Sequence, residues 1–188
     1  MNKKKVFILS WPAGAGKNTI WNLAKPLCEA YIEESVSTTS RPSRSTEQNG
    51  REYYFVSREE FQEKIKNNEF LEYALVHTNY YGSPKSELSR IIRGGKSPLY
   101  IIDVQWAILL KPLLETEWYA VRTIFLLPPS IAVMQERIRG RGTESEEQFQ
   151  IRLQSAMREF EQQDLYDMKI VNDNIEEATD ELVAILAI

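Results

Sequence analysis

A glycine-rich stretch near the amino terminus has the residue types of a phosphate-binding loop. In FILSWPAGAGKNTI (residues 7–20), Gly14, Gly16 and Lys17 follow a hydrophobic run and precede a predicted helix. Backbone N–H groups in such a loop can wrap a phosphate, and the lysine can reach its outer oxygens. The alternative is a glycine-rich turn with a surface lysine. The position between a strand and a helix favours the phosphate site.

A second stretch, PLYIIDV (residues 98–104), supplies the partner that such a loop needs. It is predicted to be a buried strand that ends in an acid, Asp103. Folds with a phosphate loop place a carboxylate there, near the Mg²⁺ of the nucleotide. Taken alone, an aspartate at a strand end is more often a helix cap or a turn residue, so this assignment depends on the loop.

The elements that must position these groups alternate between strands and helices, which indicates a βα architecture. The predicted strands are residues 5–10, 98–104, 121–128 and 168–172, and the predicted helices begin near Asn18, Gln105, Ser130, Ser145 and Ile175. Pro26 is expected to shorten or kink the first helix. The middle of the sequence departs from this alternation. Its short aromatic strands, a helix near residues 58–68 and the turn Asn49-Gly50 predict a small mixed or antiparallel insertion.

Composition excludes several classes of protein. The chain has 188 residues, 43% hydrophobic and 27% charged, as expected for one globular domain. Its net charge of −4 argues against a general nucleic-acid binder. One cysteine and one histidine, Cys28 and His77, cannot form an internal disulfide or a clustered zinc site. The apolar run after the first lysines is too short for a signal peptide or membrane span, so we expect a cytoplasmic protein.

Seven motifs, in this order and spacing, resemble those of the guanylate kinase family. They are SVSTTSRPSR (35–44), NGREYYFVSREEF (49–61), NNEFLEYA (67–74), NYYGS (79–83), LPPS (127–130), RGRGTESEE (139–147) and IVND (170–173). The resemblance runs from Val6 almost to the carboxyl terminus. It implies a single domain, residues 1–188, with an α/β P-loop kinase fold and a parallel five-stranded core sheet flanked by helices. The implied parts are a core (1–35 and 86–188), a monophosphate-binding subdomain (about 36–85) and a lid (about 138–150).

The resemblance also implies the reaction and a site for GMP. The implied reaction is ATP-dependent phosphorylation of GMP, or dGMP, to the diphosphate by direct transfer, with Mg²⁺. Guanine presents two adjacent donors, which suit an ionised carboxylate, and Glu72 matches the family's residue for this contact. The further GMP-site matches are Ser37 and Ser83 for the base, Arg41, Arg44, Tyr53 and Tyr81 for the monophosphate, and Asp103.

The ATP site and the lid follow in the same way. ATP is assigned to Gly14, Ala15, Gly16, Lys17, Asn18, Thr19 and, less firmly, Asn172, with Mg²⁺ entering near Asn18 and Asp103. Lys17, Arg137, Arg141 and Arg152 match the groups that close on the transferring phosphoryl group. Arg139 is expected to face solvent. The acids around the lid arginines argue against an RNA-binding segment.

Five positions depart from the family pattern: Trp11, Asn18, Ser40, Ile101 and Trp106. Ile101 replaces a carboxylate near the phosphates, which puts Mg²⁺ or monophosphate positioning in question. Two other functions therefore stay open: a kinase for another phosphorylated sugar or nucleotide, and a binding module without catalysis that holds a phosphorylated segment. Retention of Glu72 disfavours the first, and retention of Lys17 disfavours the second. We expect the protein to be a monomer or a homodimer.

The two tryptophans suggest a specific packing hypothesis. Trp11 begins the phosphate loop, and Trp106 follows the strand that ends at Asp103. If these strands are neighbours, the two indoles lie at the same sheet edge. They are then expected to pack on each other or across a shared apolar residue such as Ile101, which would brace a loop that lacks its first glycine. Two independent tryptophans are the alternative.

Overall fold

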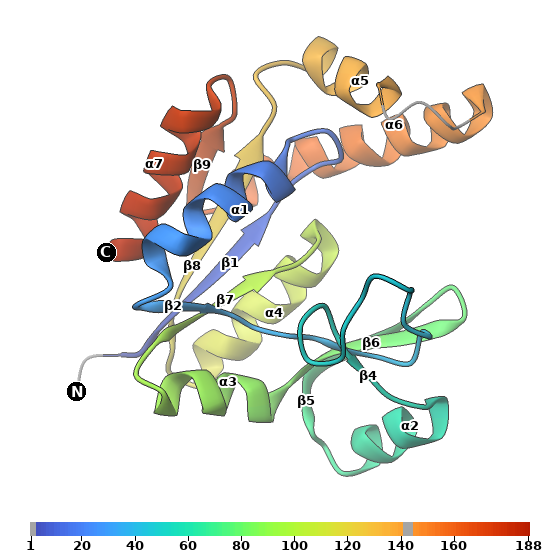
Figure 1. The fold of residues 1–188 in the computed structure, drawn as a ribbon, viewed down its shortest axis with the longest axis vertical. Helices are drawn as coiled ribbons and strands as arrows, with labels where there is room; N and C mark the ends of the chain where they lie inside the picture. Colours follow the sequence, from blue (N-terminus) through green and yellow to red (C-terminus); the bar gives the residue numbers. More distant parts are fainter. Residues whose placement is uncertain (1–2, 141–144) are drawn as a thin grey trace.

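Five parallel strands form the central sheet of the computed structural model, which describes residues 3–140 and 145–188. Their order is β2 (Ile32–Glu34), β7 (Ser97–Ile101), β1 (Lys5–Ser10), β8 (Ala120–Leu127) and β9 (Met168–Val171) (Figure 1). The strands β1 and β8 are nearly continuous apolar runs because helices cover both faces of the sheet. The predicted parallel five-stranded core is confirmed.

Side chains alternate across β1 and so build two cores. Phe7 and Leu9 pack with α1 (Lys17–Cys28) and α7 (Ile175–Ala187) on one face. Val6 and Ile8 pack with α3 (Lys85–Arg93) and α4 (Val104–Thr116) on the other. Cys28 is buried in the first core as a free thiol.

A second sheet projects from the central one and is mixed, as the turn-rich middle of the sequence indicates. Its order is β4 (Tyr54–Phe55), β3 (Thr38–Thr39), β6 (Asn79–Pro84) and β5 (Phe70–Val76). The β3–β4 pair is parallel, whereas β3–β6 and β5–β6 are antiparallel. Helix α2 (Arg58–Lys66) is held on this sheet by Phe61, whose ring stacks 4.4 Å from Phe70 and 5.2 Å from Tyr80.

Two further helices form an arm beyond the sheet. These are α5 (Ile131–Arg139) and α6 (Glu146–Glu161), which continues as the 3₁₀ turn η1 (Gln162–Leu165). The two helices pack against each other through a small apolar cluster that includes Met134 and Ile138 of α5 and Phe149 of α6. Figure 1 shows this arm and the second sheet on either side of the loop that joins β1 to α1. The chain segments that could close on a ligand therefore flank the predicted phosphate loop.

The sequence-based assignment omits β2 and α3, and it treats residues 145–165 as one α-helix where the last four form η1. Helix α1 continues through Pro26 to Cys28. Across the described part of the chain, the helices lack the length and apolar character needed to cross a membrane.

Candidate active site

The phosphate loop connects β1 to α1 with the backbone that its glycines allow. Gly14 and Gly16 have φ values of 86° and 88°, in the left-handed region that side-chain-bearing residues rarely adopt. Gly16 is the N-cap of α1, and no side chain from the described residues caps this helix. The amino-terminal end of α1, with its partial positive charge, therefore faces the loop and favours an anion there.

Two separate segments hold the loop in place. The Ala13 N–H donates to Glu159 Oε2 of α6 at 3.3 Å. The Ala15 carbonyl accepts from Asn172 Nδ2 at 2.7 Å, just after β9. Asn172 is 3% exposed, so the side chain assigned to ATP from the sequence has a direct contact with the loop backbone. These contacts restrain a loop whose first residue is tryptophan rather than glycine.

A Gly16→Ala substitution tests this packing, with Gly95→Ala as its control. Both glycines have a positive φ, so alanine is strained at either position. A Cβ at Gly16 would also collide with Asn172 Nδ2, whereas a Cβ at Gly95 meets nothing within 4 Å. We expect Gly95→Ala to cost about 1 kcal/mol in the free energy of unfolding. Gly16→Ala should cost clearly more and weaken ATP binding.

Thermal unfolding and ATP titration of the two variants measure these effects. Equal destabilisation in both, with unchanged ATP affinity in Gly16→Ala, would show that the Asn172 contact does not order the loop.

Arg137 brings a positive charge to the loop from α5. Its Nη2 donates to the Asn172 carbonyl at 3.3 Å. Its Nη1 is buried and has no hydrogen-bond partner among the described residues, although it lies beside the position of Gly16. A buried guanidinium N–H without an acceptor is costly. An anion bound at the loop would satisfy it.

The other predicted transfer residues lie around the same loop. Lys17 begins α1, and its Nζ lies 4.2 Å from the centroid of the Trp11 ring. Arg152 is half-buried on α6. Asn18 and Thr19 are exposed in the first turn of α1. Arg141 and part of the predicted lid fall outside the described residues.

A cavity of about 330 Å³ opens between the phosphate loop and the second sheet. It is lined by six of the residues predicted from the sequence: Lys17, Ser37, Tyr53, Glu72, Tyr81 and Asp103. The rest of its lining includes Trp11, Ile101 and Trp106. Residues from three distant parts of the chain thus meet in one cavity that reaches the phosphate loop.

Glu72 is the most unusual titratable group of this cavity. Ser83 Oγ donates to its Oε1 at 2.5 Å, whereas its Oε2 is buried without a hydrogen-bond partner among the described residues. Burial, together with the nearby charge of Asp103, raises the pKa of Glu72 to about 7. A carboxylate oxygen in this state is suited to a ligand that brings its own donors.

Arg41 lies beside the tyrosines predicted to share its ligand. Its guanidinium is 5.6 Å from the Tyr53 ring, and Tyr53 packs edge-on against Tyr81. The Glu47 carboxylate accepts hydrogen bonds from both terminal nitrogens of Arg41, from Nη2 at 2.9 Å and from Nη1 at 3.0 Å. An incoming phosphate must therefore compete with Glu47. Arg44 is exposed, and its backbone N–H also donates to Glu47.

Asp103 lies at the carboxyl end of β7, next to β1, as predicted. Its Oδ1 caps α4 by accepting from the Trp106 N–H at 3.1 Å, so the helix-cap alternative is also true. Within the described ranges, no cluster of three acidic, histidine or cysteine side chains could hold a metal. One carboxylate near the loop fits Mg²⁺, which uses few protein ligands when it is bound with nucleotide phosphates.

Trp11 and Trp106 line the same cavity, and the aromatic ring pairs among the described residues do not include these two. The face of Trp11 is occupied by Lys17, and Trp11 and Ile101 both pack on the core under α1. The direct-contact form of the packing hypothesis is therefore not borne out, and the ring contact of Trp11 is with the Lys17 ammonium. The two tryptophans and Ile101 instead form one wall of the cavity.

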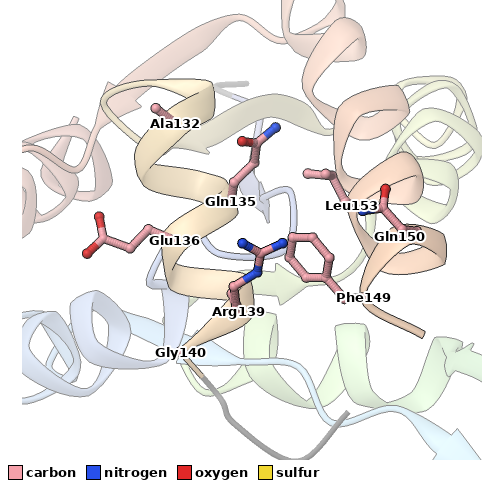
Figure 2. A pocket seen from close by; sticks show the side chains of 8 residues that line it. All are labelled: Ala132, Gln135, Glu136, Arg139, Gly140, Phe149, Gln150 and Leu153. Carbon is pink, nitrogen blue, oxygen red and sulfur yellow. The ribbon is translucent and has the colours of Figure 1, made fainter. Parts of the chain in front are cut away.

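A second cavity, of about 720 Å³, lies between α5 and α6 (Figure 2). There the Arg139 guanidinium lies 4.4 Å from the centroid of the Phe149 ring and 3.6 Å from Glu146. Arg139 is exposed, as predicted. Because this cavity is lined by the arm alone, it holds none of the predicted phosphate-loop or Glu72 contacts.

Comparisons with known proteins agree with this geometry. A family model described as guanylate kinase matches residues 3–187. The guanylate kinase of Fusobacterium nucleatum is 39% identical over 186 residues, which cover 99% of this chain and 97% of that protein. The guanylate kinase of Porphyromonas gingivalis is 41% identical over 174 residues, which cover 91% of this chain and 90% of that protein. The crystal structure of guanylate kinase from Anaplasma phagocytophilum has a TM-score of 0.71 at 34% identity, covering 100% of this chain and 86% of that one.

Proposed function

The chain belongs to the guanylate kinase family, and from that premise we propose that its 330 Å³ cavity binds GMP and its phosphate loop binds ATP. As a member of that family, the chain is an ATP-dependent kinase that phosphorylates GMP. The observation that carries the site assignment is Glu72, which lines a cavity shared with Lys17 and has one buried carboxylate oxygen without a partner in residues 3–140 and 145–188.

Glu72 is proposed to select guanine. Its two oxygens can accept from guanine N1–H and the exocyclic amine, which adenine does not offer as an adjacent pair. Ser83 keeps the carboxylate in place by donating to Oε1. Ser37 lines the same cavity and supplies a hydroxyl. The opposite end of the cavity is then left for the monophosphate, near Tyr53, Tyr81 and, after it leaves Glu47, Arg41.

Phosphoryl transfer is proposed to be direct. A phosphate oxygen of GMP attacks the γ-phosphorus of ATP, the bond to the β,γ-bridging oxygen breaks, and ADP leaves. Lys17 and Arg137 can hold the charge on the transferring group. Lys17 lines the GMP cavity, and the buried Nη1 of Arg137, beside Gly16, has no hydrogen-bond partner in the part of the chain that the structure describes. Arg152 is assigned the same task from α6, and Arg141 is assigned it from the sequence.

Mg²⁺ is proposed to enter with ATP, where it would neutralise charge on the phosphate oxygens. Asn18 and Asp103 would lie nearest to it. With isoleucine at position 101, Asp103 is the carboxylate that we propose to lie near the Mg²⁺. We further propose that the enzyme acts in the cytoplasm, as a monomer or a homodimer.

An assay of ATP against GMP, dGMP, AMP, CMP and UMP tests the proposed site. We expect GMP to be phosphorylated with a kcat/KM at least about 100-fold above that for AMP, because the buried Glu72 carboxylate would face an adenine without matching donors. Calorimetric titration of GMP in the absence of ATP separates binding from turnover. Equal use of AMP would refute the role of Glu72, whereas GMP binding without turnover would favour the binding-module alternative.

A further inference from the structure

Glu87, in the first turn of α3, is a buried carboxylate outside the GMP cavity. It is 3% exposed and accepts four hydrogen bonds. They come from the Val36 N–H at 3.4 Å, the Tyr54 hydroxyl at 3.1 Å, and Arg90 Nε and Nη2 at 3.1 and 2.8 Å. A buried carboxylate is costly unless it is well paired, so this arrangement needs a structural reason.

The donors come from the places where the two sheets are connected. Val36 lies between β2 of the central sheet and β3 of the second sheet, and α3 directly follows β6 of the second sheet. Glu87 therefore ties together both connections between the sheets. Tyr54 adds β4, which pairs with β3.

Two of the three residues that donate to Glu87, Val36 and Tyr54, are next in sequence to residues that line the GMP cavity. Val36, which donates its N–H, precedes Ser37 in the sequence, and Tyr54, which donates its hydroxyl, follows Tyr53; Ser37 and Tyr53 line the cavity. The two segments are also bonded to each other, because the Tyr54 N–H donates to the Ser37 carbonyl at 2.8 Å. Neighbouring residues of an extended segment point to opposite sides. Glu87 thus holds the outer side of segments that carry cavity residues on their inner side.

Arg90 extends the network to the central sheet. Besides Glu87, its Nη2 contacts Glu33 Oε1 on β2 at 2.6 Å. Burial alone would raise the pKa of Glu87, but the donors from Arg90, Val36 and Tyr54 outweigh burial and keep that pKa below its ordinary value. The carboxylate is consequently ionised and fully engaged near neutral pH.

We propose that Glu87 is a positioning residue for GMP binding, which fixes Ser37 and Tyr53 by holding the connections between the two sheets. This inference rests on the proposed GMP site. Glu87 does not line the GMP cavity, and the segments that it holds carry cavity residues, so its effect should fall on GMP affinity rather than on ATP affinity or on the transfer step.

The test compares Glu87→Gln with Glu59→Gln, the same change in the first turn of α2. An amide cannot accept from all four donors and leaves Arg90 without its buried counter-charge. We expect the dissociation constant of GMP to rise about ten-fold in Glu87→Gln, with the KM for ATP and kcat at saturating GMP changed less than about two-fold. Glu59 is exposed, and Glu59→Gln should bind GMP like the wild type.

Tyr54→Phe provides a second measure that keeps the fold, because it removes only the hydroxyl. We expect GMP affinity to fall about three-fold in this variant, and its effect to disappear in the Glu87→Gln background. Calorimetry with GMP and with ATP gives both affinities.

Unchanged GMP affinity in either folded variant would overturn the proposal. An equal loss of ATP and GMP affinity would also overturn it, since that result indicates general loosening of the structure. If Glu87→Gln does not fold, Tyr54→Phe decides alone. A wild-type protein that fails to bind GMP would instead refute the proposed function, and the positioning role with it.

Discussion

Replacing Lys17 or Arg137 by alanine is expected to reduce kcat by about 10² to 10³-fold. The dissociation constant of GMP should change by less than about three-fold. Negative charge spreads over the transferring phosphoryl group in the transition state, and fixed cations stabilise that state more than the bound substrates. Arg137 is prepared for this role because its buried Nη1 has no acceptor among the described residues. Lys17 lines the cavity in which the GMP phosphate would arrive.

Each of these substitutions has a control on the same helix. Lys25→Ala removes a half-exposed lysine from the last turn of α1, and Arg139→Ala removes an exposed arginine two residues after Arg137. Both controls should keep nearly wild-type kcat. Steady-state kinetics and calorimetric GMP titration measure the two quantities. Unchanged kcat in both test variants would remove the proposed transfer mechanism, and a matching loss of GMP affinity would assign the residues to ground-state binding.

The central sheet could be predicted because its inner strands carry the signal in their own residues. The runs in β1, β7 and β8 are apolar enough to be buried on both faces. Strand β2 has only three residues, two of them glutamates, and it lies at an edge where burial is partial. Helix α3 was missed although Leu88 and Ile91 have helical spacing, because its nine residues directly follow a strand.

The candidate site divides in the same way between local and distant interactions. Glycine permits the positive φ values seen at Gly14 and Gly16, and the place of the loop between a strand and a helix made it predictable. The pairing of Arg41 with Glu47, and of Ala15 with Asn172, depends on side-chain directions that no pattern reports. The failed Trp11–Trp106 pair has the same origin: strand order placed both residues at one cavity, but it could not say that Lys17 would take the indole face.

Replacing Glu72 by glutamine is expected to lower the preference for GMP over AMP, measured as the ratio of kcat/KM values, by about 10 to 100-fold. An amide offers one acceptor oxygen to guanine's two donors and turns its own N–H groups toward them. A buried mismatch of this kind costs roughly 1–3 kcal/mol. Ser83 can still donate to the remaining oxygen, so the side chain should stay in place.

The same substitution should make the protein more stable at alkaline pH. The pKa of Glu72 is about 7 in the folded protein against 4.5 for a free side chain, mainly because of burial. Between these values the folded state keeps a proton that the unfolded state has released. The free energy of unfolding therefore falls as pH rises from about 4.5 to 7, and Glu72→Gln lacks this loss. Near pH 8, Glu72→Gln should unfold at a higher temperature than the wild type.

Glu69→Gln separates this behaviour from the general effect of removing a carboxylate. Glu69 precedes β5 and pairs with Lys64, and that partner lowers its pKa, so its contribution to stability has the opposite sign and is lost as pH falls. We expect Glu69→Gln to keep the wild-type preference for GMP and to gain no stability at pH 8. Thermal unfolding at pH 5 and 8, beside kinetics with GMP and AMP, provides the comparison. If Glu72→Gln kept full guanine preference while gaining stability, its burial would be a feature of packing and the guanine contact would belong to another residue; if it lost preference without gaining stability, the carboxylate would already be satisfied in the empty cavity.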